Sequence, residues 1–396
     1  MTIDLETRLI EHLTHLCEEI GPRPLGSPAN QAAAAYIADG FAACGLGVER
    51  QTFPCQLWEE IDARLTLGEQ EVTAWANTFS ASCDVTAPTV AMGTVAELEA
   101  AELGRCIGVL YGDLAKDHGF GARSAIYYPE HMQKIVHLLE QKEPAALILV
   151  NPVIDCQERL MRDWEFPIPS VTVPAKTGLT LLQNSGQTAR LQIDAHQSPS
   201  QFCNVIARKT GGQQKRITFL AHLDTMTGAP GASDNGSGVV VLLALAEALA
   251  DKELPIDLEW IAVNGEEVGG VGGAAYLCQH EGELEQILAL INIDGAGQYL
   301  SANSVTVMGA PESLEAQVRR VHGRHPGVAW VKPWYESDHS AFLWRGVPCI
   351  PIGSVGGANI THLPSDSIEW ISPAKLAEVV SLITDIVESL KDRNRP

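Results

Sequence analysis

The fold is decided by the stretch Ile217-Thr-Phe-Leu-Ala-His-Leu-Asp224 together with Gly231-Ala-Ser-Asp-Asn-Gly-Ser-Gly238, after which an apolar run begins. Residues 217–221 form a short apolar run typical of a buried strand, and the glycine-rich loop leads into a helix predicted over residues 236–250. Strands followed by helices or loops recur along this half of the chain, at Leu258–Val263, Leu288–Ile293, Val305–Met308 and Cys349–Ile352. This alternation predicts an α/β domain with a mainly parallel, mixed sheet and helices on both faces.

The segment before this domain has a different character. Residues 56–197 contain short predicted strands, several prolines and little long helix. We expect them to form a smaller, β-rich α+β domain, inserted into a discontinuous main domain of residues 1–55 and 198–396. Within the insert, strands are predicted at Cys106–Tyr111, Ala146–Val150 and Ile168–Val173, and a helix at Met132–Gln141. In the N-terminal part, two helices within residues 6–45 are expected around a Gly/Pro-rich loop at 21–28, before a strand near Val48–Phe53.

Five potential metal ligands follow the predicted strands of the main domain. His222 and Asp294 come directly after two strands, Glu267 lies just past a third, and His362 lies in the loop after a fourth. The fifth, Asp234, lies in the loop that follows His222. Each alone has an ordinary structural explanation, such as capping of the next helix by Asp234. Because the C-terminal ends of parallel strands border the crevice where ligands bind, we expect all five to converge.

The chemical types of these side chains indicate a metal. Two histidines and three carboxylates, with no cysteine, suit catalytic zinc better than a closed structural site. One bridging carboxylate, plus one histidine and one carboxylate for each ion, would make a two-metal site with a bridging water. We therefore expect two Zn²⁺ per chain, with Co²⁺ or Mn²⁺ as substitutes.

Six segments, in this order, resemble the M28 family of zinc peptidases. They are Ala221-His-Leu-Asp-Thr225, Gly231-Ala-Ser-Asp-Asn-Gly-Ser-Gly238, Asn264-Gly-Glu-Glu-Val-Gly-Gly-Val-Gly-Gly273, Asn292-Ile-Asp-Gly295, Ser337-Asp-His339 and Thr361-His-Leu-Pro-Ser-Asp366. The N-terminal Glu19-Ile-Gly-Pro-Arg-Pro-Leu-Gly-Ser27 belongs to the same resemblance. It implies a zinc-peptidase/phosphorylase-like fold, and the insert is similar to a protease-associated domain.

The resemblance also implies a role for each candidate residue. His222 and Asp294 would bind one zinc, and Glu267 and His362 the other. Asp234 would bridge both ions. Adjacent residues past a strand end point in different directions, so the neighbouring Glu266 can face the attacking water and serve as the general base.

Further polar residues are expected to support the ligands or to contact the substrate. Asp224 could accept the second N–H of His222, fix its tautomer and so assist catalysis. Asp366 is expected either to support His362 in the same way or to form an ordinary turn. A third group either helps to hold the substrate or oxyanion, or only caps and packs a helix start: Tyr335, Asp338 and His339.

The expected reaction is hydrolysis of a peptide bond, with removal of N-terminal amino acids as the main hypothesis. A carboxypeptidase or dipeptidase, and an N-acyl amino acid deacylase, remain alternatives on the same site. A carboxypeptidase would need a cation for the substrate carboxylate, for which the sequence offers Arg23, Arg123 and Lys332. A glutaminyl cyclase is disfavoured by the Glu266-Glu267 pair, and a catalytically inactive binding protein is disfavoured because every ligand position is filled.

Charge limits the partners. The 396 residues carry 27 Lys+Arg against 49 Asp+Glu, a formal net charge of -22, which repels phosphate backbones and anionic lipid surfaces. We therefore expect a peptide or small amide as substrate, and neither nucleic acid nor a membrane as partner. The first residues lack a basic n-region and a long apolar stretch, which predicts a cytoplasmic protein. The sequence makes no prediction of oligomeric state.

Overall fold

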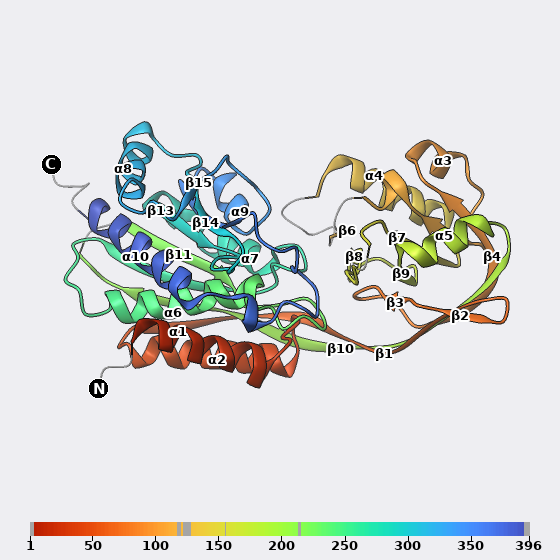
Figure 1. Cartoon of the computed structure of the whole chain (residues 1–396), viewed down its shortest axis with the longest axis horizontal. Helices are drawn as coiled ribbons and strands as arrows, with labels where there is room; N and C mark the ends of the chain where they lie inside the picture. Colours follow the sequence, from red (N-terminus) through yellow and green to blue (C-terminus); the bar gives the residue numbers. More distant parts are fainter. Residues whose placement is uncertain (1–3, 117–119, 122–127, 155, 213–214, 392–396) are drawn as a thin grey trace. The chain divides into compact units, whose positions relative to one another are not determined.

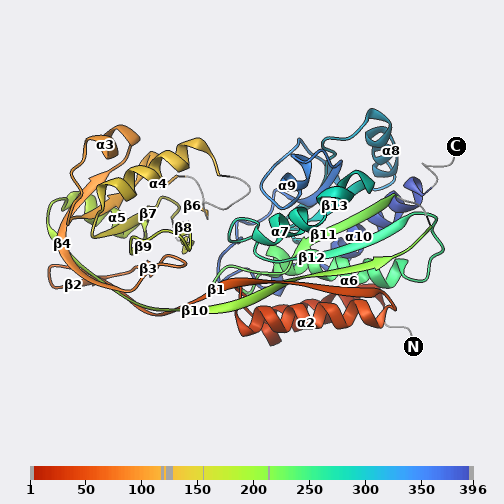
Figure 2. The same cartoon turned by 180° about the vertical axis from the view of Figure 1, so that it is seen from behind.

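The computed structural model describes residues 4–116, 120–121, 128–154, 156–212 and 215–391. The chain divides into two compact units (Figures 1 and 2). The large unit consists of Met1–Cys55 and Gln201–Pro396, and the inserted unit consists of Gln56–Ser200. Each unit is described by itself below.

The large unit is built on a mixed sheet that is mainly parallel. Strand β11 (Arg216–His222) lies at its centre and pairs in parallel with β12 (Asp257–Val263) and β13 (Ile287–Ile293). Outside β13, β16 (Cys349–Val355) is also parallel, whereas β14 (Ala302–Val305) is antiparallel to β16, and β15 (Ala329–Trp330) pairs with β14. The end of β10 (Thr188–Lys209) pairs antiparallel to β12. The predicted fold class of this domain is confirmed.

Helices cover both faces of this sheet. The α-helices are α1 (Leu5–Thr14), α2 (Pro28–Ala43), α6 (Ser237–Leu249), α7 (Val271–Gln279), α8 (Glu312–His322), α9 (His339–Leu343) and α10 (Pro373–Leu390). Shorter π and 3-10 turns are η1 (His15–Ile20), η3 (Ala232–Gly236), η4 (Glu281–Gln286) and η5 (Ile368–Trp370). Helix α6 packs on β11, β12 and β13 and contacts α1, α2 and α10, whereas α9 packs on β13 and β16 and contacts α7 (Figure 2).

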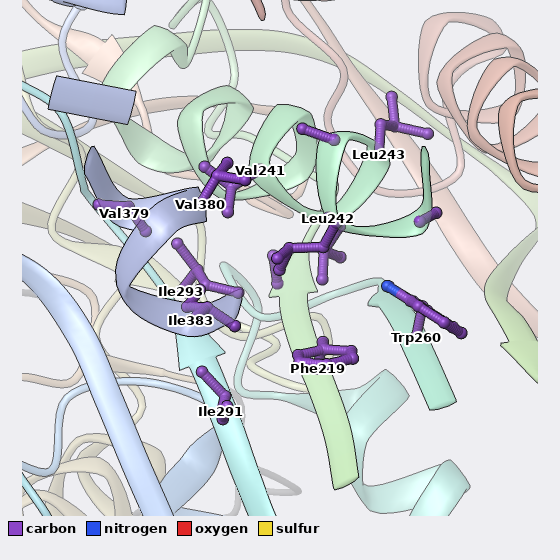
Figure 3. Close-up of a cluster of buried hydrophobic side chains, with 14 of the residues drawn as sticks. Phe219, Val241, Leu242, Leu243, Trp260, Ile291, Ile293, Val379, Val380 and Ile383 are labelled. Carbon is purple, nitrogen blue, oxygen red and sulfur yellow. The ribbon is translucent and has the colours of Figure 1, made fainter. Parts of the chain in front are cut away.

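The core between α6 and the sheet explains why α6 is apolar around most of its circumference. Figure 3 shows Leu242 pointing toward Phe219 of β11, with Trp260 of β12 beside them and Ile383 of α10 at the other end of the cluster. All four side chains are completely buried. The window Ala232–Leu249 is apolar and long enough to cross a membrane, but 83% of it is buried inside the protein, as in the core helix of a globular domain.

The inserted unit has its own sheet and core. Strands β4 (Cys83–Met92), β5 (Ile107–Leu110), β7 (Ala146–Asn151) and β9 (Ser170–Pro174) are parallel neighbours. They are connected through α3 (Val95–Ala100), α4 (Glu130–Lys142) and, after β9, α5 (Ala175–Gln183). Short strands complete it: β2 (Gln70–Val72), β3 (Trp75–Ala76), and the pair β6 (Phe120–Gly121) and β8 (Met161–Arg162). The parallel strands and the helices between them form βαβ units, whereas the sequence predicted a β-rich α+β domain. Membership of the protease-associated class stays a prediction.

Two strands are much longer than the sequence predicts. The strand expected near Val48–Phe53 is β1, which extends over Gly47–Leu67, and β10 is of similar length. The two strands pair with each other. Most residues of their middle parts are exposed or half-buried, so they lack the regular apolar alternation from which strands are predicted.

A smaller difference concerns β14. The sequence predicts a strand at Val305–Met308, whereas the regular ladder to β16 covers Ala302–Val305. The segment that follows keeps only an isolated bridge between Met308 and Cys349. The small polar residues Asn303 and Ser304 form the buried ladder, and such residues give no apolar strand signal.

Candidate metal centre

The structure brings the five predicted ligands together at the C-terminal ends of the parallel strands. His222 is the last residue of β11, and Asp294 directly follows β13. Glu267 lies in the loop after β12, and His362 lies in the loop after β16. His222, Asp234 and Glu267 each offer a ligand atom within 4.8 Å of the others. The convergence expected from strand order is therefore present in the geometry.

Asp234 stands between the two histidines. Its Oδ1 lies 3.0 Å from His222 Nε2, and its Oδ2 lies 3.3 Å from His362 Nε2. Each histidine Nε2 also lies near a second carboxylate: Asp294 Oδ1 is 3.6 Å from His222 Nε2, and Glu267 Oε2 is 3.1 Å from His362 Nε2. The five side chains thus form two sets that share one carboxylate.

These distances fit metal ligation. Two donor atoms on one tetrahedral zinc, each about 2.1 Å from the ion, are separated by about 3.4 Å. The four nitrogen–oxygen distances of the cluster range around that value. Three carboxylates gathered around a fully buried histidine also need cationic charge, since like charges in a poorly solvated site repel one another. The donor set and its spacing therefore fit two cations.

Asp234 is positioned by its neighbours and does not cap the following helix. The π turn η3 contains Asp234, and at the start of α6 the N–H of Gly238 donates to Asn235 Oδ1 at 2.9 Å. The carboxylate of Asp366 accepts hydrogen bonds from the backbone N–H groups of Ser233 (2.8 Å) and Asp234 (3.0 Å). Burial raises the pKa of Asp366 to about 7. Asp366 therefore supports the loop of the shared carboxylate, and its own N–H donates to the Leu363 carbonyl at 3.0 Å, in keeping with the turn that was the alternative to a contact with His362.

Asp224 differs in a similar way from its predicted role. Its carboxylate Oδ1 is 3.7 Å from His222 Nδ1, too far for a hydrogen bond, while its backbone carbonyl is 3.2 Å from the same nitrogen. The carboxylate instead accepts the backbone N–H groups of Gly265 (2.8 Å), Glu266 (3.2 Å) and Glu267 (3.2 Å). The backbone of Asp224 therefore orients His222, and its side chain holds the loop of the two glutamates.

Glu266 is the partly exposed member of the glutamate pair, whereas Glu267 is buried. Burial, and then the nearby carboxylates of Asp338, Glu267 and Asp294, raise the pKa of Glu266 well above its ordinary value, while His222 acts in the opposite direction. A carboxyl group with a raised pKa beside a reaction centre can take up and return a proton. The pair thus combines a half-buried acid, Glu266, with a buried ligand candidate, Glu267.

The segment around residues 334–339 contributes buried and exposed side chains. His339 is completely buried, and its ring nitrogens lie 2.9 Å from the Trp334 carbonyl and 3.2 Å from Asn292 Nδ2. Asp338 is 4% exposed, and neither of its carboxylate oxygens has a hydrogen-bond partner among the described residues. Burial, and then the carboxylates around it, raise the pKa of Asp338 to about 7. Tyr335 is 49% exposed, so of these three only Tyr335 is open to solvent.

The three cations considered for a substrate carboxylate are not equivalent. Arg23 is completely buried, and its guanidinium donates to backbone carbonyls, so it does not face solvent. Lys332 is exposed, and Arg123 lies outside the described residues. In the sequence, Arg23 was a candidate only for binding a substrate carboxylate. Its partners, Leu223, Pro230 and Gly231, lie about 200 positions away in the chain, so sequence periodicity does not indicate them.

Comparison with known proteins agrees with this geometry. Residues 204–387, which contain all five ligand candidates, match the model of Peptidase family M28. This part of the chain belongs to peptidase family M28. Over nearly its full length the chain is also similar to Aminopeptidase YwaD of Bacillus subtilis (strain 168), with 26% identity over 97% of this chain and 85% of that protein.

Solved structures extend the match to the whole fold. An aminopeptidase from Aneurinibacillus sp. strain AM-1 has a TM-score of 0.77 at 23% identity, covering 98% of this chain and 93% of that one. The zinc aminopeptidase BSAP from Bacillus subtilis has a TM-score of 0.78 at 22% identity, covering 99% and 96%. A glutaminyl cyclase from Porphyromonas gingivalis has a TM-score of 0.52 at 14% identity. Identities this low show the fold alone.

Proposed function

We propose that this M28 peptidase is an aminopeptidase that uses two zinc ions, held by the five-residue cluster. The observation that carries the proposal is the position of Asp234, whose two oxygens face two different histidines. His222 and Asp294 would hold one ion and His362 and Glu267 the other, with Asp234 shared. When bound, the zinc ions lower the pKa of water from about 15.7 toward about 7 and polarise the scissile carbonyl.

The chain's own residues supply the proton transfer. Glu266 precedes Glu267 in a loop whose backbone N–H groups donate to Asp224, so its carboxylate would lie beside the ions without serving as a ligand. It accepts a proton from the attacking water and delivers a proton to the departing amine. A positioned general base of this kind contributes roughly 10²- to 10⁴-fold to the rate.

Cleavage at the N-terminal end is favoured by the charge of the site. The bound ions would offset the charge of their ligands Asp234, Glu267 and Asp294, which leaves the half-exposed Glu266 as the carboxylate that can attract a protonated α-amino group and repel a C-terminal carboxylate. The buried position of Arg23 removes one of the three cations considered for a substrate carboxylate. Aminopeptidase YwaD, which is similar over nearly the whole chain, supports the same choice.

One experiment separates the candidate activities. The wild-type protein is tested on an unblocked leucyl peptide, its N-acetylated form, its C-amidated form and N-acetyl-leucine, with added zinc and with chelator. We expect free leucine from the unblocked and the C-amidated peptides only, and no product with chelator. Release from N-acetyl-leucine would instead indicate a deacylase, and loss of activity on the amidated peptide would indicate a carboxypeptidase.

The variant Glu266→Gln tests the assignment of the base. We expect it to bind two zinc equivalents like the wild type, because the five ligands remain, while kcat falls roughly 10²- to 10⁴-fold. Near-normal turnover with two bound zincs would show that another group is the base. Zinc is counted by titration of the metal-free protein, so the result does not depend on activity.

A further inference from the structure

Arg23 lies in the N-terminal Gly-Pro-Arg-Pro loop between η1 and α2, and its side chain is completely buried. Its guanidinium has no carboxylate within ion-pair distance among the described residues. A buried cation without such a partner is costly unless its N–H groups are satisfied. The contacts that satisfy them show what this arginine does.

The guanidinium connects two loops that carry metal-ligand candidates. Nε donates to the carbonyl of Leu223 at 2.7 Å, directly after His222. Nη1 donates to the carbonyl of Pro230 at 2.8 Å, and Nη2 donates to that of Gly231 at 3.1 Å, in the loop that leads to Asp234. One planar group therefore links the segment that follows His222 to the loop that precedes Asp234.

The backbone of the same residue reinforces this link. The N–H of Arg23 donates to Thr225 Oγ1 at 2.9 Å, and its carbonyl accepts from Asn30 Nδ2 at 3.1 Å. Asn30 also exchanges side-chain hydrogen bonds with Asn264, the residue that precedes the glutamate loop. Arg23 thus contacts the loops of His222 and Asp234 directly and the loop of Glu267 through one intermediate residue.

We propose that Arg23 is a positioning residue of the metal centre, which fixes the separation between the ligand of one ion and the ligand shared by both ions. The inference rests on the proposed two-zinc site. An arginine suits the task because its rigid fork directs several donors into one plane, whereas a lysine offers a single ammonium on a flexible stem. A ligand set must be held to within about 0.5 Å for full function, so loss of this connection should weaken the site without removing any ligand.

The test compares Arg23→Lys with Arg216→Lys. Arg216 is also buried, but it lies at the opposite end of β11, where its partners are Glu259, Glu283 and Tyr276. For each protein we measure zinc affinity of the metal-free form by competition with a chromophoric chelator, the urea midpoint of the metal-free form, and kcat and KM at saturating zinc. Arg216→Lys reports what loss of a buried arginine costs in stability alone.

We expect Arg23→Lys to weaken at least one of the two zinc equivalents by roughly 10- to 100-fold, the usual effect of losing support behind metal ligands. Arg216→Lys should leave both affinities within about 3-fold. If Arg23→Lys lowers the urea midpoint like the control but leaves zinc affinity and kcat within about 3-fold, Arg23 only holds the N-terminal segment and the inference is wrong.

A second variant covers the case in which Arg23→Lys does not fold. Thr225→Val removes the hydroxyl that accepts the Arg23 N–H but keeps the shape of a buried side chain. It should weaken zinc binding in the same direction by roughly 3- to 10-fold, and an unchanged affinity would count against the inference. A wild-type protein that binds no zinc would overturn the proposed function itself, whereas normal wild-type binding with unaffected variants overturns only the role of Arg23.

Discussion

Replacing Asp224 by asparagine tests whether one carboxylate holds the loop of both glutamates. The side chain is completely buried and accepts three backbone N–H groups, those of Gly265, Glu266 and Glu267. In Asp224→Asn one oxygen remains to accept from Gly265, but the new amide N–H₂ faces the N–H of Glu267. An unsatisfied buried donor costs about 1–3 kcal/mol, and the remaining hydrogen bonds lose their charge assistance.

Together these losses destabilise the native conformation of the loop by about 2–4 kcal/mol. If all of it affects the transition state, kcat/KM for an unblocked peptide falls about 30- to 1,000-fold, because about 1.4 kcal/mol corresponds to a factor of ten. The carbonyl of Asp224 that orients His222 is unchanged, so the substitution isolates the side chain's function. The assay is the rate of amino-acid release at saturating zinc, together with a zinc titration.

A matched control is available at the start of β12, the strand that leads to the glutamate loop. Asp257, at the start of β12, accepts the backbone N–H groups of Gly211 and Gly212, away from the metal centre. Asp257→Asn should lower the free energy of unfolding and leave kcat/KM within about 2-fold. The reasoning fails if Asp224→Asn keeps kcat/KM within about 3-fold of the wild type, or if both variants lose activity equally.

Two further predictions concern packing around the sheet. Glu259 is completely buried, lies within 3.1 Å of Arg216 and accepts hydrogen bonds from Thr218 and Tyr276. Glu259→Leu leaves the buried Arg216 without its main partner, so it should lower the free energy of unfolding in urea by about 3–5 kcal/mol, and a loss under about 1 kcal/mol would contradict this. Gly272→Ala would place its Cβ 2.0 Å from the carbonyl oxygen of Asn264, just before the glutamate loop, so kcat should fall at least about 10-fold; unchanged kcat would show that this loop can shift freely.

The sequence was sufficient for the main domain and for its ligand candidates. The buried strands around Phe219 and Ile291 have continuous apolar runs, and the ligand candidates occur where those runs end. Parallel strands place their C-terminal ends at one edge, so chain order translated directly into proximity. The division into two sets around Asp234 came from the family resemblance and corresponds to the distances found.

The supporting residues could not be assigned in this way. Asp224 was expected to contact the His222 ring, and Asp366 either to contact the His362 ring or to form a turn, but both carboxylates accept backbone N–H groups. Proximity in sequence suggested those rings as partners, whereas the contacts depend on loop conformations that side-chain patterns do not encode. Arg23 was missed for a related reason, because its partners at Leu223 and Pro230 are main-chain carbonyls, which every residue carries.

The pairing of β1 with β10 also bears on how the chain folds. The insert leaves the large unit through β1 and rejoins it through β10, which pairs with β4 inside the insert and with β12 of the large unit. If the large unit assembled first, closing a flexible loop of the insert's length would cost about 4 kcal/mol of chain entropy. An insert that folds first as a separate unit brings β1 and β10 together in advance. The pairing of β10 with β12 then closes only a short loop and costs correspondingly less chain entropy. Residues that stabilise the insert can thereby set the folding rate of a centre to which they contribute no ligand.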